Sequence, residues 1–73
     1  MTPEAADSLF AIIDGMAEDT YRFFDAPAED LRQVLYSYRR RLRPRKFTAV
    51  DYGSWTVVVC EPSPETKRLK YGR

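Results

Sequence analysis

The fold class depends on residues 46–60, whose sequence is KFTAVDYGSWTVVVC. β-branched and aromatic residues are frequent on both sides of Gly53-Ser54, which predicts two strands over residues 46–52 and 55–60. Glycine at the first of two loop positions suits a type II′ turn, so we expect a tight antiparallel hairpin. This turn sets a register in which three pairs share one face: Tyr52 with Trp55, Val50 with Val57, and Thr48 with Val59.

The two faces of this hairpin carry different side chains, and we expect the face with Tyr52 and Trp55 to pack in the core. The opposite face is also apolar near its base, so a helix, a partner or another copy of the chain could cover it. Its members are Phe47, Ala49, Asp51, Thr56, Val58 and Cys60. Because a two-stranded sheet is marginal in water, the hairpin needs the helices and could gain a third strand from a partner or a second copy.

The residues before the hairpin predict two helices. The first begins at Thr2, where a capping hydroxyl is followed by a proline and an acid. Apolar residues then recur at helical spacing on one face: Ala6, Leu9, Ile12, Ile13, Met16, Thr20, Phe23 and Phe24. Gly15 costs about 1 kcal/mol relative to alanine inside a helix, so a break at Asp14-Gly15 is an alternative. The helix ends before Pro27, because the residue preceding a proline resists the helical conformation.

Pro27 also begins the second helix, and Pro44 ends it. The short connection between the helices favours an antiparallel helical hairpin. The sequence therefore predicts an α+β fold with a two-helix antiparallel hairpin, then a two-stranded antiparallel β-hairpin, then a flexible basic C-terminal tail. We expect one compact domain over residues 1–61 and a disordered tail over residues 62–73. The expected core combines the stripe of the second helix with one face of the hairpin: Leu31, Val34, Leu35, Tyr38, Val57 and Val59.

The residue types present argue against catalysis. The chain has 73 residues and no histidine, which removes the commonest general base and metal ligand. The single cysteine, Cys60, provides neither a zinc cluster nor a thiol paired with a base, and the three glycines are scattered rather than gathered in a phosphate loop. Asp14 and Glu18 lie one predicted helical turn apart, a pattern that on a small helix usually belongs to a solvated face. We therefore expect a non-enzymatic protein with no catalytic residue, no metal and no cofactor.

Several features of the sequence bear on its cellular compartment. One cysteine cannot form an internal disulfide, which favours a reducing environment. The N-terminal residues lack the basic start and apolar core of a secretory signal, and no apolar stretch approaches the roughly 20 residues that cross a bilayer. We expect a soluble cytoplasmic protein that makes no membrane contact.

The net charge of +1 conceals a division of the chain into an acidic and a basic part. Residues 1–30 hold eight acids and one base, for a charge of −7, and residues 31–73 hold eleven bases and three acids, for a charge of +8. Such asymmetry is informative about partners. Short single-domain chains with a divided charge are common among phage and mobile-element products, which favours a regulatory role.

The basic side chains concentrate in residues 39–46, whose sequence is RRRLRPRK. Arginine interleaved with tyrosine along one flank of the second helix suits phosphate contact with base stacking, and it suits an acidic protein surface as well. The structural alternative is that acids of the first helix face bases of the second, with arginines favoured at a helix C-terminus. The predicted partner-binding or nucleic-acid-binding residues are Arg32, Tyr36, Arg39, Arg40, Arg43, Arg45 and Lys46, of which Arg32, Tyr36, Arg39 and Arg43 share the flank.

Tyr52 and Trp55 are candidate aromatic contacts at the hairpin tip, either inserted into a partner or packed as a cross-strand pair on the helices.

The leading hypothesis is a small non-enzymatic regulator, for example an inhibitor, that binds and modulates a larger protein assembly. The alternatives are a DNA- or RNA-binding regulator that uses residues 39–46, and an assembly subunit without independent activity. A homodimer also remains an alternative, since a second copy could complete the sheet.

Overall fold

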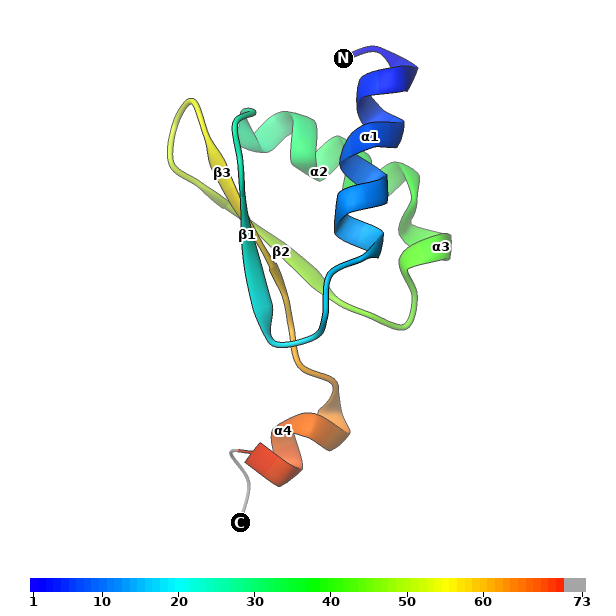
Figure 1. The fold of residues 1–73 in the computed structure, drawn as a ribbon, viewed down its shortest axis with the longest axis vertical. Helices are drawn as coiled ribbons and strands as arrows, with labels where there is room; N and C mark the ends of the chain where they lie inside the picture. Colours follow the sequence, from blue (N-terminus) through cyan, green and yellow to red (C-terminus); the bar gives the residue numbers. More distant parts are fainter. Residues whose placement is uncertain (71–73) are drawn as a thin grey trace.

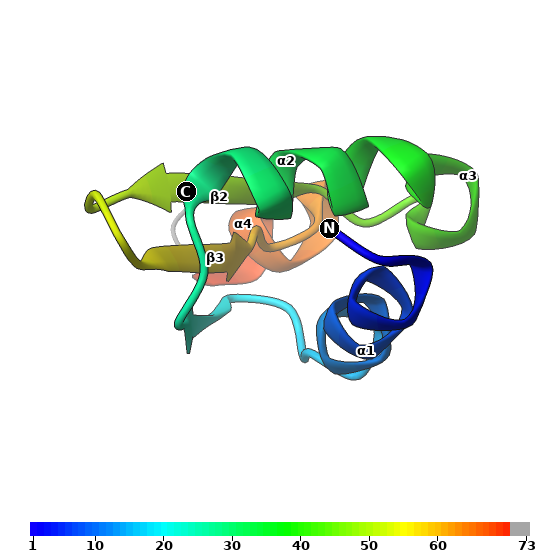
Figure 2. The same ribbon diagram turned by 90° about the horizontal axis from the view of Figure 1, so that it is seen from above.

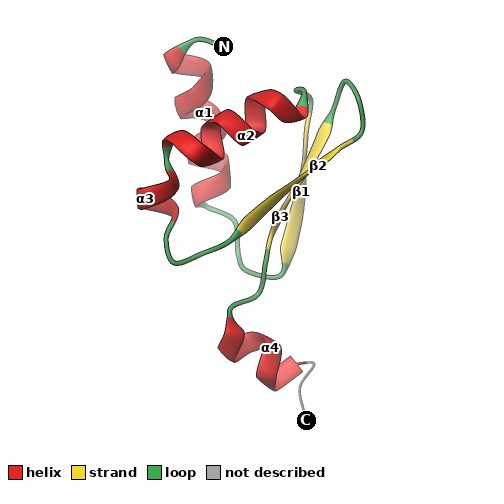
Figure 3. Cartoon of the chain, turned by 180° about the vertical axis from the view of Figure 1, so that it is seen from behind, coloured by secondary structure: helices red, strands yellow, loops and turns green. Residues whose placement is uncertain are grey.

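The computed structural model describes residues 1–70 and has an α+β fold built on a three-stranded antiparallel sheet (Figure 1). The strands are β1 (Thr20–Phe24), β2 (Phe47–Asp51) and β3 (Thr56–Cys60), and their order in the sheet is β1-β3-β2. The helices are α1 (Pro3–Asp14), α2 (Ala28–Ser37), α3 (Arg39–Leu42) and α4 (Pro64–Lys70). Figures 1 and 3 show α1, α2 and α3 together on one side of the sheet.

The predicted β-hairpin is confirmed, together with its register. Thr48 lies opposite Val59 and Val50 lies opposite Val57, while the Tyr52 amide donates to the Trp55 carbonyl at 3.1 Å. Gly53 adopts a φ of +94°, a region that glycine enters without the steric cost of a Cβ.

The prediction of which face of the hairpin forms the core is wrong. Thr56, Val58 and Cys60 are fully buried, whereas Val57 and Val59 are only half-buried on the opposite face. The helices cover the face with Val58, and the Thr56 hydroxyl donates to the Ala26 carbonyl there at 2.7 Å. Helices therefore cover this face, which was one of the three expected alternatives.

The first predicted helix is correct only up to the glycine. Helix α1 ends at Asp14 with Gly15 as its C-cap, which confirms the alternative of a break at this point. Residues 20–24, expected on the same helix, instead form β1 and pair antiparallel with β3. The chain itself therefore supplies the third strand. Because β1 separates α1 from α2, the expected helical hairpin with a short connection is also wrong.

The second predicted helix is present in two pieces. Helix α2 follows Pro27, which occupies its N-cap, and α3 follows a break at Tyr38, whose φ of −106° and ψ of 18° depart from helical values. Of the expected core, Leu31 and Val34 are fully buried, and Leu35 and Tyr38 pack at the core's edge. The buried cluster also includes residues from α1, β1, α3 and β3: Phe10, Ile13, Phe24, Leu42 and Val58.

A short helix, α4, occupies part of the segment expected to be a flexible tail. Figure 1 shows it beyond the end of the sheet at which β3 ends, away from α1, α2 and α3. Residues 71–73 of the expected tail lie outside the described residues. The division into a domain over residues 1–61 and a disordered tail remains a prediction.

Candidate protein-binding surface

The side of the sheet turned away from α1, α2 and α3, here called the outer face, is lined by apolar side chains. Side chains alternate between the two faces of a strand, so the residues that neighbour the buried Val58 and Thr56 point to the outer face. The register then aligns Tyr21 with Val59 and Phe23 with Val57 across the first strand pair. The polar Thr48 lies on this face opposite Val59, and the apolar members of the outer face are Tyr21, Phe23, Val50, Tyr52, Trp55, Val57 and Val59.

Three aromatic rings form a row across the outer face near the hairpin turn. The ring centroids of Phe23 and Trp55 are 5.0 Å apart, and those of Tyr52 and Trp55 are 4.3 Å apart with an angle of 5° between the ring planes. The predicted cross-strand pair of Tyr52 and Trp55 therefore exists, but it lies on the outer face rather than against the helices. Tyr52 stacks on Trp55 and Phe23 meets Trp55 at a tilt of 39°, so the three rings make a continuous apolar ridge.

The outer face leaves a large aromatic area accessible. Tyr21 is 76% exposed, Phe23 56% and Tyr52 54%. With 150–250 Å² for a whole aromatic side chain, these fractions amount to roughly 300–450 Å². An apolar patch of this size is comparable to the largest one on a typical monomer, and such patches often mark interaction sites. The exposed aromatic area of the outer face is about half of the ~800 Å² that each partner buries in a standard interface.

The predicted basic residues of the second helix lie with the helices, on the opposite side of the sheet from the outer face (Figure 1). Tyr36 and Arg39 come together as predicted, with the guanidinium 4.1 Å from the ring centroid and its Nη1 donating to the Tyr36 carbonyl at 2.8 Å. The break at Tyr38 and the end of α3 at Leu42 interrupt the predicted flank, so Arg43 lies outside the helix. Arg32, Arg40 and Lys46 are exposed.

Arg45 has a structural role. Its Nη2 lies 2.6 Å from the Asp14 carboxylate, its Nη1 donates to the Asp14 carbonyl at 2.8 Å, and its Nε donates to the Leu42 carbonyl at 3.2 Å. This side chain therefore joins the end of α1 to the segment before β2. The contact joins an acid of α1 to a base that follows α3, and not to a base of the second predicted helix, as the structural alternative had it.

A second pairing of the two parts lies beside α1. The Arg41 guanidinium is 4.8 Å from the Phe10 ring centroid, and that ring stacks on Tyr38 at 4.2 Å. The Tyr38 hydroxyl donates to the Asp7 carboxylate, and this hydrogen bond, with partial burial, raises the pKa of Tyr38. These contacts hold α1 against the start of α3.

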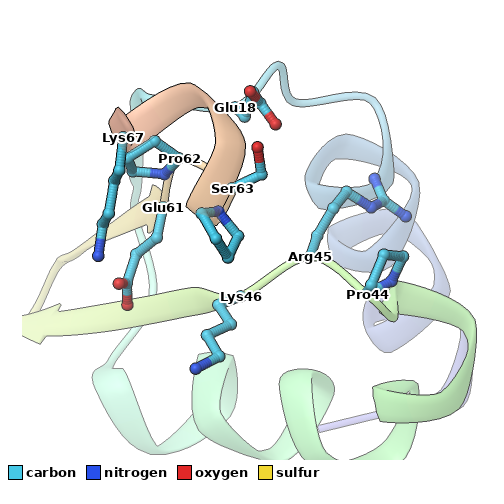
Figure 4. A pocket seen from close by; sticks show the side chains of 9 residues that line it. Glu18, Pro44, Arg45, Lys46, Glu61, Pro62, Ser63 and Lys67 are labelled. Atoms are coloured by element: carbon cyan, nitrogen blue, oxygen red, sulfur yellow. The ribbon is translucent and has the colours of Figure 1, made fainter. Parts of the chain in front are cut away.

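A pocket of about 460 Å³ lies between the segment before β2 and α4 (Figure 4). Its acidic side chains already accept hydrogen bonds within the protein: Glu61 from the Thr48 hydroxyl at 2.7 Å, and Glu18 from the Thr66 hydroxyl. Figure 4 shows Lys46 extending from the segment just before β2, which borders the pocket. The lining residues are Glu18, Pro44, Arg45, Lys46, Glu61, Pro62, Ser63, Pro64 and Lys67.

The one thiol of the chain lies in the interior. Cys60 is fully buried in β3, and this burial raises the pKa of its thiol, an effect to which the Glu18 carboxylate adds and which Arg45 opposes. The thiol is therefore protonated at neutral pH. Asp14 pairs with Arg45 and Glu18 with Thr66, so each of the two carboxylates has its own partner in the fold.

Sequence reasoning did not place Tyr21 and Phe23 on the same surface as Tyr52 and Trp55, because it assigned both to a helix. The signal that could have located them is the run Thr20–Phe24, TYRFF, in which every residue but the arginine favours a strand. The pocket was not anticipated, although Arg45 and Lys46 had been selected for another reason.

No protein-family model, no curated protein and no solved structure matches this chain. Within residues 1–70, none of the helices has the length and apolar composition needed to cross a membrane.

Proposed function

We propose that this chain is a small non-enzymatic regulator that binds a larger protein assembly, and that the outer face is its contact surface. The observation that supports this proposal is the row of Phe23, Trp55 and Tyr52, together with the highly exposed Tyr21 on the same face. Aromatic side chains are enriched at the centres of protein interfaces, because they bury large areas and lose few rotamers. The partner surface that fits this face is apolar at its centre.

The arrangement of charge favours a protein over a nucleic acid at this face. The arginines of residues 39–45 belong to the helix side, so a nucleic acid on the outer face would lack them as phosphate contacts. It would instead approach Glu61, whose carboxylate is held on the outer face by Thr48. The stacking of Tyr52 on Trp55 also occupies ring surface that an inserted base would need.

The second candidate function is a DNA- or RNA-binding regulator, which the exposed arginines around α3 favour. Arg39, stacked on Tyr36, and Arg40 are exposed on the helix side, and Arg43 follows them. If these residues bind phosphates, the logarithm of the affinity should fall linearly with the logarithm of the salt concentration, by about 0.7 to 0.9 per contact.

The two candidates can be separated by affinity capture from the native host with the tagged full chain, with and without nuclease. Two variants are compared: Tyr21→Ser/Phe23→Ser on the outer face, and Arg39→Ala/Arg40→Ala on the helix side. We expect a captured protein that survives nuclease treatment, that is lost with the serine variant and that is retained with the alanine variant. Capture that depends on nucleic acid and on the arginines would overturn the proposal and support the second candidate.

A further inference from the structure

Strand β1 lies at an edge of the sheet, and the hydrogen-bonding pattern shows which of its backbone groups point away from it. Tyr52 donates to Trp55, and Glu61 donates to the Lys46 carbonyl, so the odd-numbered residues of β3 bond to β2. The even-numbered residues of β3 therefore face β1, opposite Thr20, Arg22 and Phe24. It follows that the N–H and C=O groups of Tyr21 and Phe23 point outward from the edge.

Apart from Arg22 at its centre, β1 lacks the residue types that natural proteins place on an exposed edge strand to block pairing. Four of the five residues of β1 are exposed, and only Phe24 is buried. The strand contains neither proline nor lysine, the two residue types that commonly block edge pairing. The other edge is different, since α2 contacts β2 and runs alongside it (Figure 2), and Phe47 and Ala49 are half-buried there.

We propose that the edge of β1 accepts an extended segment of the partner protein as a fourth strand. This inference rests on the proposed function, because it specifies how the protein partner binds. The added strand would exchange backbone hydrogen bonds with Tyr21 and Phe23, and the side chains of its residues opposite them would extend the outer face. In this way one segment uses both the open edge and the exposed aromatic rings.

The charge of β1 specifies the chemistry of the added segment. Arg22 lies opposite Val58 on the helix side of the sheet, yet it is exposed because the helices do not cover this part of β1. The residue of the added strand that faces Arg22 is an acid, since opposite charges across a strand pair are favourable. The segment therefore has an acid flanked on both sides by apolar residues, which face Tyr21 and Phe23.

The same arginine argues against a second copy of this chain as the added strand. A symmetric antiparallel pairing that overlaps all five residues of β1 would align Tyr21 with Phe23 of the second copy and would place the two Arg22 side chains directly opposite each other. Like charges in this position destabilise a strand pair.

The test selects peptides from a random library displayed on phage against the immobilised full chain. Selected peptides are then measured by fluorescence anisotropy against four variants, one of which, Phe23→Ser, removes a ring from the outer face. Tyr21→Pro removes an N–H that points away from β3 and so leaves the sheet intact, while Tyr21→Thr is its matched control, which loses the ring but keeps the N–H. Arg22→Glu reverses the charge that would select the acid.

We expect enriched peptides with the pattern apolar–acid–apolar, binding to Tyr21→Pro at least about fivefold more weakly than to Tyr21→Thr. Arg22→Glu should reject these peptides and, in a fresh selection, enrich peptides with a basic residue at the central position. This reversal tests the proposal even if Tyr21→Pro fails to fold, which circular dichroism would show.

Equal binding to Tyr21→Pro and Tyr21→Thr would overturn the fourth-strand proposal, as would the absence of any enriched peptide. If such peptides still lost affinity for the Phe23→Ser variant, the outer face would remain the binding surface and only the edge would be excluded. Peptides that were insensitive to Phe23→Ser as well would count against both proposals.

Discussion

Two neighbouring valines of the central strand provide a matched pair for testing which face of the sheet is the core. Val58 is fully buried beneath the helices, and Val57 is half-buried on the outer face between Phe23 and Val50. Val58→Ala removes two methyl groups, worth about 1.6 kcal/mol at ~0.8 kcal/mol for each buried carbon. A residual cavity of about 50 Å³ adds about 1 kcal/mol, so the expected loss in the free energy of unfolding is about 2–3 kcal/mol.

The same deletion at Val57 should cost less than about 1 kcal/mol, because part of the lost surface is already in water. For a domain of this size, Val58→Ala should lower the melting temperature by about 10–20 °C and Val57→Ala by only a few degrees. Urea unfolding followed by the fluorescence of Trp55 measures both losses. A Val57→Ala variant that was as destabilised as Val58→Ala, or more so, would refute the assignment of the two faces.

Three further predictions concern single contacts. Cys60 is buried with a raised thiol pKa, so a disulfide reagent such as Ellman's reagent should modify the native protein at least about a hundredfold more slowly than the urea-unfolded protein. The pKa of Tyr38 is raised in the folded state, so the contribution of Tyr38 to the free energy of unfolding is fully present below the ordinary tyrosine pKa near 10 and is lost as the pH rises through the folded-state pKa. In urea titrations at increasing alkaline pH, Tyr38→Phe should therefore lose less stability than the wild type. Arg45→Met removes the pairing with Asp14 and the hydrogen bond to the Leu42 carbonyl, and urea denaturation should show a loss of about 1–2 kcal/mol in the free energy of unfolding. This loss should diminish little at high salt, because two of the acceptors of Arg45 are neutral carbonyls, which salt does not screen as it screens a carboxylate.

The hairpin and the starts of α1 and α2 could be predicted because each depends on local chemistry. Gly53-Ser54 between two β-rich runs set the turn and the register, and Thr2 set the start of α1, where its hydroxyl accepts from the Ala5 amide at 3.1 Å. Pro27 likewise set the start of α2. These signals lie within a few residues of the feature that they determine.

Strand β1 could not be predicted in the same way, because its residues satisfy two patterns. Thr20, Phe23 and Phe24 continue the apolar face of a helix that contains Ile13 and Met16, and the run from Thr20 to Phe24 also suits a strand. The choice depends on pairing with β3, which is more than thirty residues away in the sequence.

The sequence also does not determine which face of the hairpin packs in the core, for a related reason. Three consecutive valines place apolar side chains on both faces, so alternation cannot distinguish core from surface. The packing of the helices on Val58 decides it, and this packing also makes Tyr52 and Trp55 part of an exposed surface. The sequence therefore predicts the pair of Tyr52 and Trp55 in the candidate site, but it does not predict that this pair is exposed on the outer face.

Photo-cross-linking from two matched positions tests whether the outer face contacts a protein partner. Benzoylphenylalanine replaces either Tyr21, which is 76% exposed on the outer face, or Tyr36, which is 68% exposed beside Arg39 on the helix side. After irradiation in the native host, we expect a nuclease-resistant cross-link to another protein from position 21 and none from position 36. Cross-links from position 36 alone, or from neither position, would contradict this expectation.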